Sequence, residues 1–326
     1  MTKLSDSYNR PLNYLRVSVT DRCNLRCVYC MPAEGVPLVA HGDILTYEEI
    51  VSVTRAAVEL GIVKVRLTGG EPLVRAGLPD LVAMLSAIEG IDDISMTTNA
   101  ELLERHADDL KASGLRRVNV SLDSLRSIRF RRITRVGSLG HVLRGIDAAR
   151  RAGLGPVKTN TVVIRGTNDD EVIDFARLTL DGDWHVRFIE YMPFANGACQ
   201  ANDLLVTVAE MKERIEILGP LEPAFGSGGG PAKYFRLPGA KGTIGFISPV
   251  SDHFCRACNR LRLTADGRLR PCLFSDSEVD LRGPLRQGAG IGDIKRLIRE
   301  AVSSKPEGHR LKAGVTCERF MAQIGG

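Results

Sequence analysis

The sequence predicts an α/β fold, a partial (β/α)6 TIM-type barrel, followed by a C-terminal region with a different pattern. Short β-rich runs alternate with helical stretches as far as about residue 192. Six strand-then-helix units imply a parallel sheet with helices outside it. Six units are fewer than the eight of a closed barrel. We therefore expect an open barrel in residues 1–218 and a second region in residues 219–326.

Local signals mark the individual elements. The predicted strands are residues 15–20, 64–68, 93–99, 117–123, 157–163 and 184–192. A capping box of Thr46 and Glu49 begins the first helix, and Gly61 ends it. The other predicted helices are residues 78–89, 101–113, 139–152, 169–180 and 207–218. The Pro/Gly-rich segment 219–230 that follows is either a linker or a loop that crosses the barrel.

The first five strands alternate between apolar and polar residues. The polar residues that share one parity are Arg16, Ser18, Thr20, Arg66, Thr68, Ser95, Thr97, Asn99, Asn119, Ser121, Asp123, Lys158 and Asn160. The apolar set must face the helices, so the polar set faces the lumen. Each unpaired polar group there would cost about 1–3 kcal/mol, so a polar ligand or water must fill the lumen. An antiparallel sheet with one solvated face is the alternative.

Composition limits the function classes. The 326 residues are 44% hydrophobic and 25% charged, which is ordinary for a soluble globular protein. The net charge of +5 is too small to indicate nucleic acid, but it suits an anionic small substrate. Residues 1–13 lack the apolar core of a signal peptide, and no run reaches membrane-spanning length. We expect a cytoplasmic protein whose eight cysteines are ligands rather than disulfides.

Three cysteines, Cys23, Cys27 and Cys30, lie at C-x3-C-x2-C spacing after the first strand. Clustered thiolates select zinc, copper(I) or iron–sulfur centres. A closed zinc site and an ordinary iron–sulfur cluster each take four protein ligands. Three cysteines on a four-iron cluster leave one iron open to a small molecule. A zinc site with a distant fourth ligand is the alternative.

The loop of Cys23, Cys27 and Cys30 resembles the signature of the radical S-adenosylmethionine (SAM) enzymes. Gly69-Gly70-Glu71-Pro72 ends the second predicted strand and is similar to the GGEP element of that superfamily, although alone it could be a plain turn. The resemblance implies that the open iron binds SAM and that one electron splits SAM into methionine and a 5′-deoxyadenosyl radical.

A second set of three cysteines, Cys255, Cys258 and Cys272, lies in the C-terminal region. Arg260 and Arg262 share strand parity between them, so both can face one ligand. An arginine offers a planar fork to a phosphate or a base edge. This set indicates a second cluster with an open iron at a substrate site. A zinc site completed by His253 is the alternative.

Two three-cysteine sets that flank a partial barrel resemble the GTP 3′,8-cyclases, the radical SAM family of molybdenum cofactor biosynthesis. The matching elements are residues 21–30, 69–72, 97–99, 187–193, 254–267 and Gly325-Gly326. Ala100 departs from the family pattern, which usually has glycine after Thr-Thr-Asn. Such an enzyme removes the C3′ hydrogen of GTP, and the ribose radical attacks C8 of guanine to give (8S)-3′,8-cyclo-7,8-dihydroguanosine 5′-triphosphate.

The resemblance also implies roles for single residues. Two [4Fe–4S] clusters and SAM are the implied cofactors, and Tyr29, Gly70, Ser121 and Met192 are the implied SAM contacts. The implied GTP contacts are Arg16, Arg66, Thr97, Lys158, Arg260, Leu261 and Arg262. Of these, Arg16, Arg260 and Arg262 are the candidate catalytic residues. The glycine tail is expected to enter the active site, whereas Cys199 and Cys317 are expected to be free thiols.

The implied partners are a reductant of flavodoxin or ferredoxin type and, downstream, cyclic pyranopterin monophosphate synthase; a homodimer is left open. We expect no nucleic-acid or membrane partner. The basic run 126–135 is expected to be a solvated or salt-bridged surface, although the family resemblance leaves a substrate-side role open for some of its arginines. Two other functions stay open at this point: a radical SAM enzyme that modifies a peptide, and a non-catalytic iron–sulfur or zinc binding protein.

Overall fold

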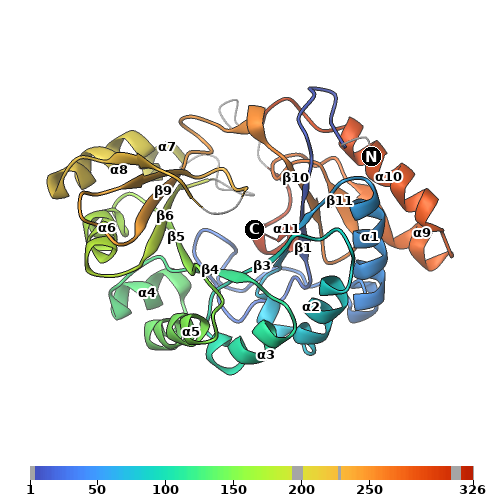
Figure 1. Ribbon diagram of the computed structural model, residues 1–326, viewed down its shortest axis with the longest axis horizontal. Coiled ribbons are helices and arrows are strands. Elements are labelled where there is room, and N and C mark those ends of the chain that lie inside the picture. Colours follow the sequence, from blue (N-terminus) through green and yellow to red (C-terminus); the bar gives the residue numbers. More distant parts are fainter. Residues whose placement is uncertain (1–3, 193–200, 227–228, 310–316, 326) are drawn as a thin grey trace.

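One curved sheet organises the chain in this computed structural model, which describes residues 4–192, 201–226, 229–309 and 317–325 (Figure 1). The strands are β1 Tyr14–Ser18, β2 Lys64–Thr68, β3 Asp93–Thr98, β4 Arg117–Ser121, β5 Lys158–Val163, β6 His185–Glu190, β7 Glu222–Ala224, β8 Lys233–Arg236, β9 Thr243–Ile247, β10 Arg260–Leu263, β11 Arg268–Arg270 and β12 Val279–Asp280. Their order in the sheet is β12-β11-β10-β1-β2-β3-β4-β5-β6-β9-β8-β7.

The middle of the sheet is a partial barrel. The strands from β10 through β1 to β6 and on to β9 are paired with one another in parallel. Antiparallel strands flank them on both sides, and the sheet ends at β12 and β7. The six predicted strands and the open α/β barrel are confirmed. The sequence did not predict that β10 would pair with β1 and β9 with β6. The C-terminal region thus extends both edges of the same sheet. The domain boundary after residue 218 stays a prediction.

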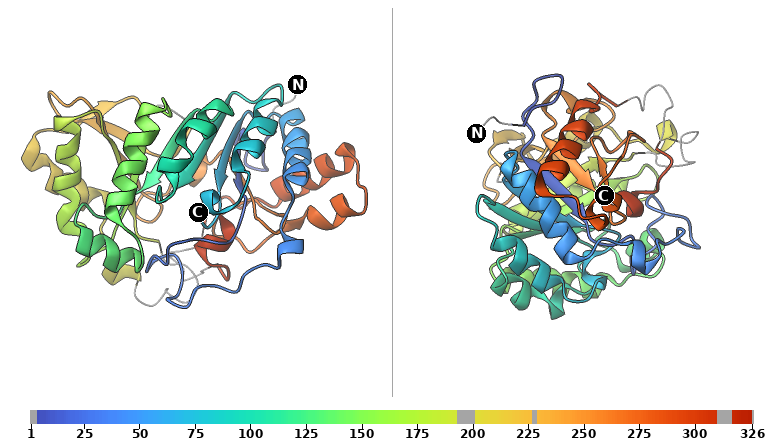
Figure 2. Two further views of the ribbon diagram at one scale, coloured as in Figure 1. Left: turned by 90° about the horizontal axis from the view of Figure 1, so that it is seen from below. Right: turned by 90° about the vertical axis from the view of Figure 1, so that its right-hand side faces the viewer.

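Helices cover the outer face of the sheet (Figure 2). The longer ones are α1 Tyr47–Glu59, α2 Leu78–Ser86, α3 Ala107–Ala112, α4 Ser127–Thr134, α5 Leu139–Arg151, α6 Val172–Asp181, α8 Val208–Ile215 and α10 Ile291–Ser303. Three short helices are α7 Ala201–Leu204, α9 Arg282–Arg286 and α11 Met321–Ile324, and α11 lies at the cavity, where Met321 and Ala322 line it. The capping boxes at Thr46 and Thr207 are present. Among the described residues, no helix combines the length and apolarity needed to cross a bilayer.

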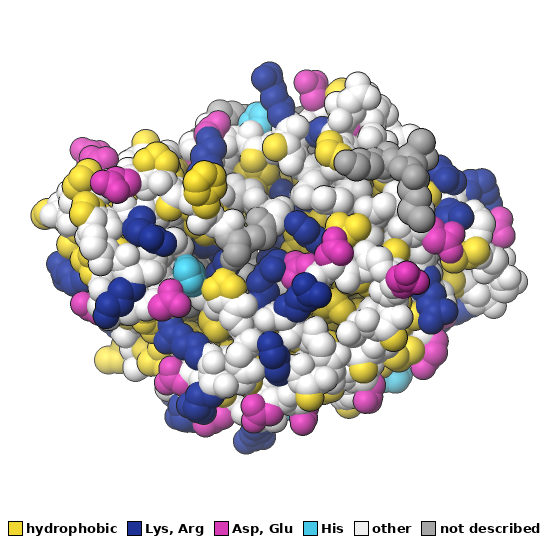
Figure 3. Space-filling view, viewed as in Figure 1, with side chains coloured by type: hydrophobic (Ala, Val, Ile, Leu, Met, Phe, Trp, Pro, Cys, Tyr) yellow, Lys and Arg dark blue, Asp and Glu magenta, His cyan; other side chains and the backbone are white. Residues whose placement is uncertain are grey.

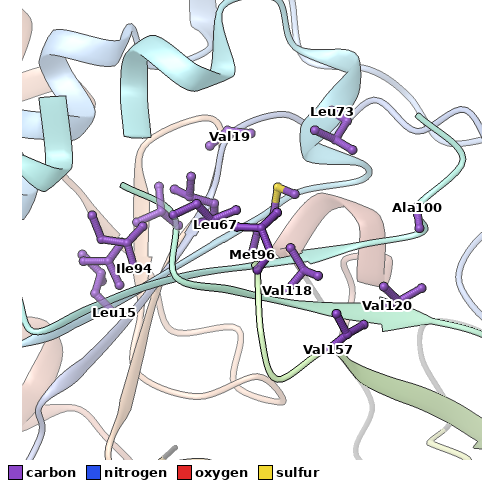
Figure 4. Packing of buried hydrophobic residues seen from close by; sticks show 14 of the residues in the cluster. Leu15, Val19, Leu67, Leu73, Ile94, Met96, Ala100, Val118, Val120 and Val157 are labelled. Atoms are coloured by element: carbon purple, nitrogen blue, oxygen red, sulfur yellow. The ribbon is translucent and has the colours of Figure 1, made fainter. Parts of the chain in front are cut away.

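The hydrophobic core lies between the sheet and these helices. Leu15, Leu67, Met96 and Val118, which have the apolar parity of β1 to β4, are all buried there (Figure 4). Ala100 follows β3 with φ of 60° and is fully buried. This left-handed conformation costs an alanine about 1–2 kcal/mol. This cost explains why glycine is favoured at the position. Ala100 nevertheless adopts the left-handed conformation that the turn requires.

Candidate functional site

A cavity in the barrel lumen contains both cysteine sets. All six cysteines line it: Cys23, Cys27, Cys30, Cys255, Cys258 and Cys272. The polar strand residues that line it are Arg16, Arg66, Thr68, Thr97, Asn99, Ser121, Asp123 and Asn160. The strand-parity prediction of a polar lumen is confirmed for these eight residues. The other residues assigned to the lumen are not in the cavity lining: Ser18, Thr20, Ser95, Asn119 and Lys158. Figure 3 shows a hollow near the centre of one face, with basic side chains in it.

Helix α4 holds the first cysteine loop from outside the lumen. The backbone N–H of Val28 donates to Ile133 O (2.9 Å), and that of Arg26 donates to Thr134 O (3.1 Å). Arg135, directly after α4, donates to the carbonyl oxygens of Arg26 (2.8 Å) and Met31 (3.0 Å). Sequence reasoning treated this basic run as surface and missed the role of Arg135, because its acceptors are about a hundred residues earlier in the chain.

The rest of that run does form surface ion pairs, as expected. Arg126 pairs with Asp170 and Asp174, and Arg129 pairs with Asp170 and Glu171. These pairs connect α4 to the start of α6.

The Gly69-Gly70-Glu71 turn supports the same loop from inside the lumen. Gly70 N–H donates to Thr20 O (2.7 Å), and a Cβ at Gly70 would overlap the carbonyl of Arg22. Only glycine allows this approach of two backbone segments. Glu71 accepts hydrogen bonds from Thr98 Oγ1 and from Asn99 N–H (both 2.7 Å). Burial raises the pKa of Glu71 to about 7.

The first cysteine set suits a cationic metal centre. Burial, together with neighbouring negative groups, raises the pKa of Cys23 to about 11 and of Cys30 to about 12, and it raises the pKa of Cys27 well above its usual value. All three thiols line the same cavity. Such thiols become thiolates when a metal displaces their protons. Three soft donors in one buried loop therefore fit an iron–sulfur cluster.

The second cysteine set has a different electrostatic environment. Burial opposes ionisation, but the charges of Arg260 and Lys305 lower the pKa of Cys258 to about 6. Arg260 Nη2 also lies 3.7 Å from Cys258 Sγ. His253 lies in the cavity lining beside His309, with their ring centroids 5.3 Å apart. In the described part of the chain, no group of three or more His, Cys, Asp and Glu side chains is placed to hold a single metal ion.

Three arginines form a row across adjacent strands of the lumen. Arg16 of β1 is in register with Arg262 of β10 on one side and with Arg66 of β2 on the other. Adjacent strands lie about 4.8 Å apart, so the like charges repel one another. Burial and this repulsion lower the pKa of Arg16 well below its usual value. Such a row is stabilised by an anionic ligand.

Further polar groups in the lumen are available to a ligand. Within the described residues, Tyr14 Oη, Thr97 Oγ1 and Asn160 Oδ1 are buried and have no hydrogen-bond partner. Arg187 of β6 also lines the cavity and donates to Asn119 Oδ1 (2.5 Å). Sequence reasoning did not select Arg187, because the alternation is less regular in its strand.

The structure brings most of the predicted contact residues together. The cavity lining includes Tyr29, Gly70, Ser121, Met192, Arg16, Arg66, Thr97, Arg260 and Arg262. The side chain of Leu261 is buried in the core, so only its backbone can face the lumen. Lys158 is buried with its Nζ 5.7 Å from the ring centroid of Tyr234. These contacts with SAM and GTP stay predictions.

The end of the chain lies inside the barrel (Figure 1). Gly325 O accepts hydrogen bonds from Arg262 Nη1 (3.0 Å) and Thr68 Oγ1 (3.3 Å). The expected approach of the tail to the site is therefore observed for Gly325. Cys317 is a buried free thiol, and burial raises its pKa to about 11. Pro193, Cys199 and Gly326 lie outside the described residues.

Comparison with known proteins defines the class. Residues 17–179 match the model of the Radical SAM superfamily, and residues 184–311 match the model named Molybdenum Cofactor Synthesis C. A solved structure of Streptococcus suis SuiB bound to S-adenosylmethionine has the same fold: its TM-score is 0.60 at 14% identity, over 88% of this chain and 69% of that one. The chain is a radical SAM enzyme, and its cofactors are SAM and an iron–sulfur cluster.

Curated relatives define the family. The chain is 56% identical to GTP 3′,8-cyclase of Pelotomaculum thermopropionicum and 52% identical to that of Moorella thermoacetica, in each case over 99% of this chain and 100% of the relative. It is 51% identical to the enzyme of Thermodesulfovibrio yellowstonii, again over 99% of this chain and 100% of the relative. The chain belongs to the GTP 3′,8-cyclase family, which confirms the predicted resemblance.

Proposed function

We propose that this chain cyclises GTP to (8S)-3′,8-cyclo-7,8-dihydroguanosine 5′-triphosphate, the first step of molybdenum cofactor biosynthesis. The observation that carries the proposal is the row of Arg262, Arg16 and Arg66 between the two cysteine sets in one cavity. Three neighbouring guanidinium groups fit a triphosphate better than any neutral substrate.

The cofactors and the protein have separate tasks in this proposal. SAM and the cluster held by Cys23, Cys27 and Cys30 supply a radical that removes a hydrogen atom. Tyr29, Gly70, Ser121 and Met192 would position SAM, as the family resemblance implies. The arginine row would bind and orient the triphosphate, which limits the motion of the ribose relative to SAM. The polar atoms of Thr97 and Asn160 are available to the nucleoside.

A second [4Fe–4S] cluster on Cys255, Cys258 and Cys272 is part of the proposal. The three thiols line the same cavity as the arginine row. The pKa of Cys258 is lowered to about 6 by Arg260 and Lys305, which favours its thiolate form. With three protein ligands, one iron would be free to bind the purine of GTP, and Arg260 lies beside it. Arg16, Arg260 and Arg262 are the proposed catalytic residues, since each would contact the nucleotide.

We further propose a protein electron donor of flavodoxin or ferredoxin type and a cytoplasmic location, where thiols stay reduced. The product would pass to cyclic pyranopterin monophosphate synthase. The barrel core of residues 1–218 and the region 219–326 are proposed as the two functional parts of the chain.

Anaerobic reconstitution followed by product identification tests the proposed function. With SAM, GTP and a reductant, we expect the cyclised nucleotide and about eight irons per chain. Zinc in place of iron at the second set would contradict the second cluster. SAM cleavage without a change in GTP, but with modification of a peptide, would instead support the peptide-modifying alternative.

Lys158 provides a prediction about proton uptake. Burial lowers its pKa to about 7, and the nearby Arg187 and Arg117 charges add to the effect. At about pH 8 the side chain is therefore mostly neutral without nucleotide. A triphosphate favours the charged form and raises the pKa, so GTP binding should take up nearly one proton at that pH and much less below about pH 6.

Calorimetry in buffers of different ionisation enthalpy measures this uptake. The Lys158→Arg variant keeps the positive charge but stays ionised throughout, so it should bind GTP without proton uptake. An equal uptake in this variant would show that another group titrates.

A further inference from the structure

Two buried cations lie beside the second cysteine set, outside the cavity lining. Lys305 follows α10 and is only 3% exposed, and Arg10 precedes β1 and is 6% exposed. Both donate to backbone carbonyls at or beside the three cysteines. Neither residue was selected from the sequence, and neither is in the cavity lining.

Lys305 connects the segments that contain Cys258 and Cys272. Its Nζ donates to Arg260 O (2.9 Å) and to Pro271 O (2.5 Å). Arg260 is two residues after Cys258, and Pro271 directly precedes Cys272. One ammonium group thereby fixes the backbone just after Cys258 and just before Cys272.

Arg10 holds the remaining cysteine. Its Nη1 donates to Cys255 O (2.9 Å) and to Glu307 O (2.7 Å), and its Nη2 donates to Pro306 O (2.6 Å). The Nε is paired with the fully buried carboxylate of Asp6 (2.6 Å). Since Pro306 and Glu307 directly follow Lys305, Arg10 also fixes the segment that presents the second cation.

The charge of Lys305 has no carboxylate to balance it. In the described part of the chain, no Asp or Glu forms an ion pair with this ammonium, and the negative groups that act on it are Cys258 and Cys272. A buried, unpaired ammonium is costly. A four-iron cluster on three thiolates is a monoanion when oxidised and a dianion when reduced, so it would supply the missing negative charge.

The first cysteine set has more acidic surroundings, although Arg26 also acts on Cys23. Glu71 acts on Cys23, and Asp123 acts on Cys27 and Cys30, as negative neighbours. Net charge and hydrogen bonding around a cluster are among the factors that set its potential. The two cysteine sets therefore differ in the charge of their surroundings, which is one of the factors that set the reduction potential of a bound cluster.

We propose that Lys305 and Arg10 are positioning residues for the second cysteine set. Both fix the backbone at its three thiols, and Lys305 also balances the negative charge of the centre that the thiols hold. This inference rests on the second cluster of the proposed function. It predicts that the charge of Lys305, and not only its hydrogen bonds, stabilises the bound cluster and favours its reduced form.

The test uses the full chain with Cys23, Cys27 and Cys30 all changed to serine, so that only the second set can hold iron. In this parent we expect about four irons per chain. Lys305→Gln keeps a hydrogen-bond donor but removes the charge. We expect its midpoint potential, measured by EPR-monitored titration, to shift to a more negative value. Iron should be lost to a chelator about 10- to 100-fold faster, as for other residues that support metal ligands.

Three variants complete the comparison. Lys305→Arg keeps the charge and should stay close to the parent in potential. Lys295→Gln is the matched control, because Lys295 lies on α10 and pairs with Glu59 at the surface. Arg10→Gln is a second, independent variant, and we expect it to shift the potential in the same direction.

The outcomes separate the two proposals. An unchanged potential in Lys305→Gln, with normal iron content, would show that Lys305 is only a structural tie and would overturn this inference alone. A parent chain that binds zinc or no iron would overturn the second cluster, and with it this inference. A negative shift in Lys305→Gln that Lys305→Arg does not show supports it.

Discussion

Replacing Gly325 by valine should reduce cyclisation at least about 100-fold while both cysteine sets still bind iron. The residue has φ of 82°, where a non-glycine residue is strained by about 1–2 kcal/mol. A Cβ there would lie 2.6 Å from Thr68 Oγ1 and 2.7 Å from Ser18 Cβ, both of which belong to rigid strands. The last turn of the chain must therefore move away from the lumen.

The loss of activity follows from the contact that the tail makes. Gly325 O accepts a hydrogen bond from Arg262, so displacing the tail removes an acceptor that fixes one of the three aligned guanidinium groups. Turnover, iron content and GTP affinity should be measured together, and removal of residues 325–326 should have the same effect. Gly292→Ala is the control, because nothing lies within 4 Å of a Cβ there. Normal turnover in Gly325→Val would show that the tail has no part in the reaction.

Changing Cys258 to serine should abolish cyclisation and leave cleavage of SAM intact. Although burial opposes ionisation, the charges of Arg260 and Lys305 lower the pKa of Cys258 to about 6, so its thiolate is readily available as a ligand. Without it the second cluster loses one of three protein ligands, and the iron content should fall from about eight to about four per chain. Formation of 5′-deoxyadenosine with a chemical reductant reports on the first cluster, and nucleotide analysis reports on cyclisation.

Cys317→Ser is the matched control for that variant. Cys317 is buried near Cys272 in a small apolar cluster, but its thiol contacts Arg270 and Asp276 rather than the cavity. A serine hydroxyl can make the same contacts, so we expect full iron content and full activity. Cyclisation that survives in Cys258→Ser would show that the second set is only structural.

Strand alternation predicted the lumen well, because the side-chain period of two is a local property of the backbone. Arg16, Arg66 and Asn160 could therefore be assigned to the lumen without any knowledge of their neighbours. The sequence could not place β9 and β10 at the two edges of the barrel. Pairing of β10 with β1 joins residues at opposite ends of the chain, and no local pattern encodes that partner.

The supporting residues of the site were hidden for the same reason. Arg10 and Lys305 act on backbone carbonyls, which carry no sequence signal, and Arg10 is 245 residues from Cys255. Arg135 looked like part of a charged surface, and only the fold shows that its guanidinium reaches the first cysteine loop. Ligand residues thus have recognisable spacings, whereas the residues that hold them in place do not.

The pairing of β1 with β10 has a consequence for biogenesis. During synthesis on the ribosome, β1 and the adjoining Cys23 loop emerge early, but the strand that covers that edge emerges only near the end. The edge of β1 that pairs with β10 must therefore stay unpaired while most of the polypeptide is made. The first cysteine loop therefore stays accessible along this edge until the C-terminal strands and the tail take their places.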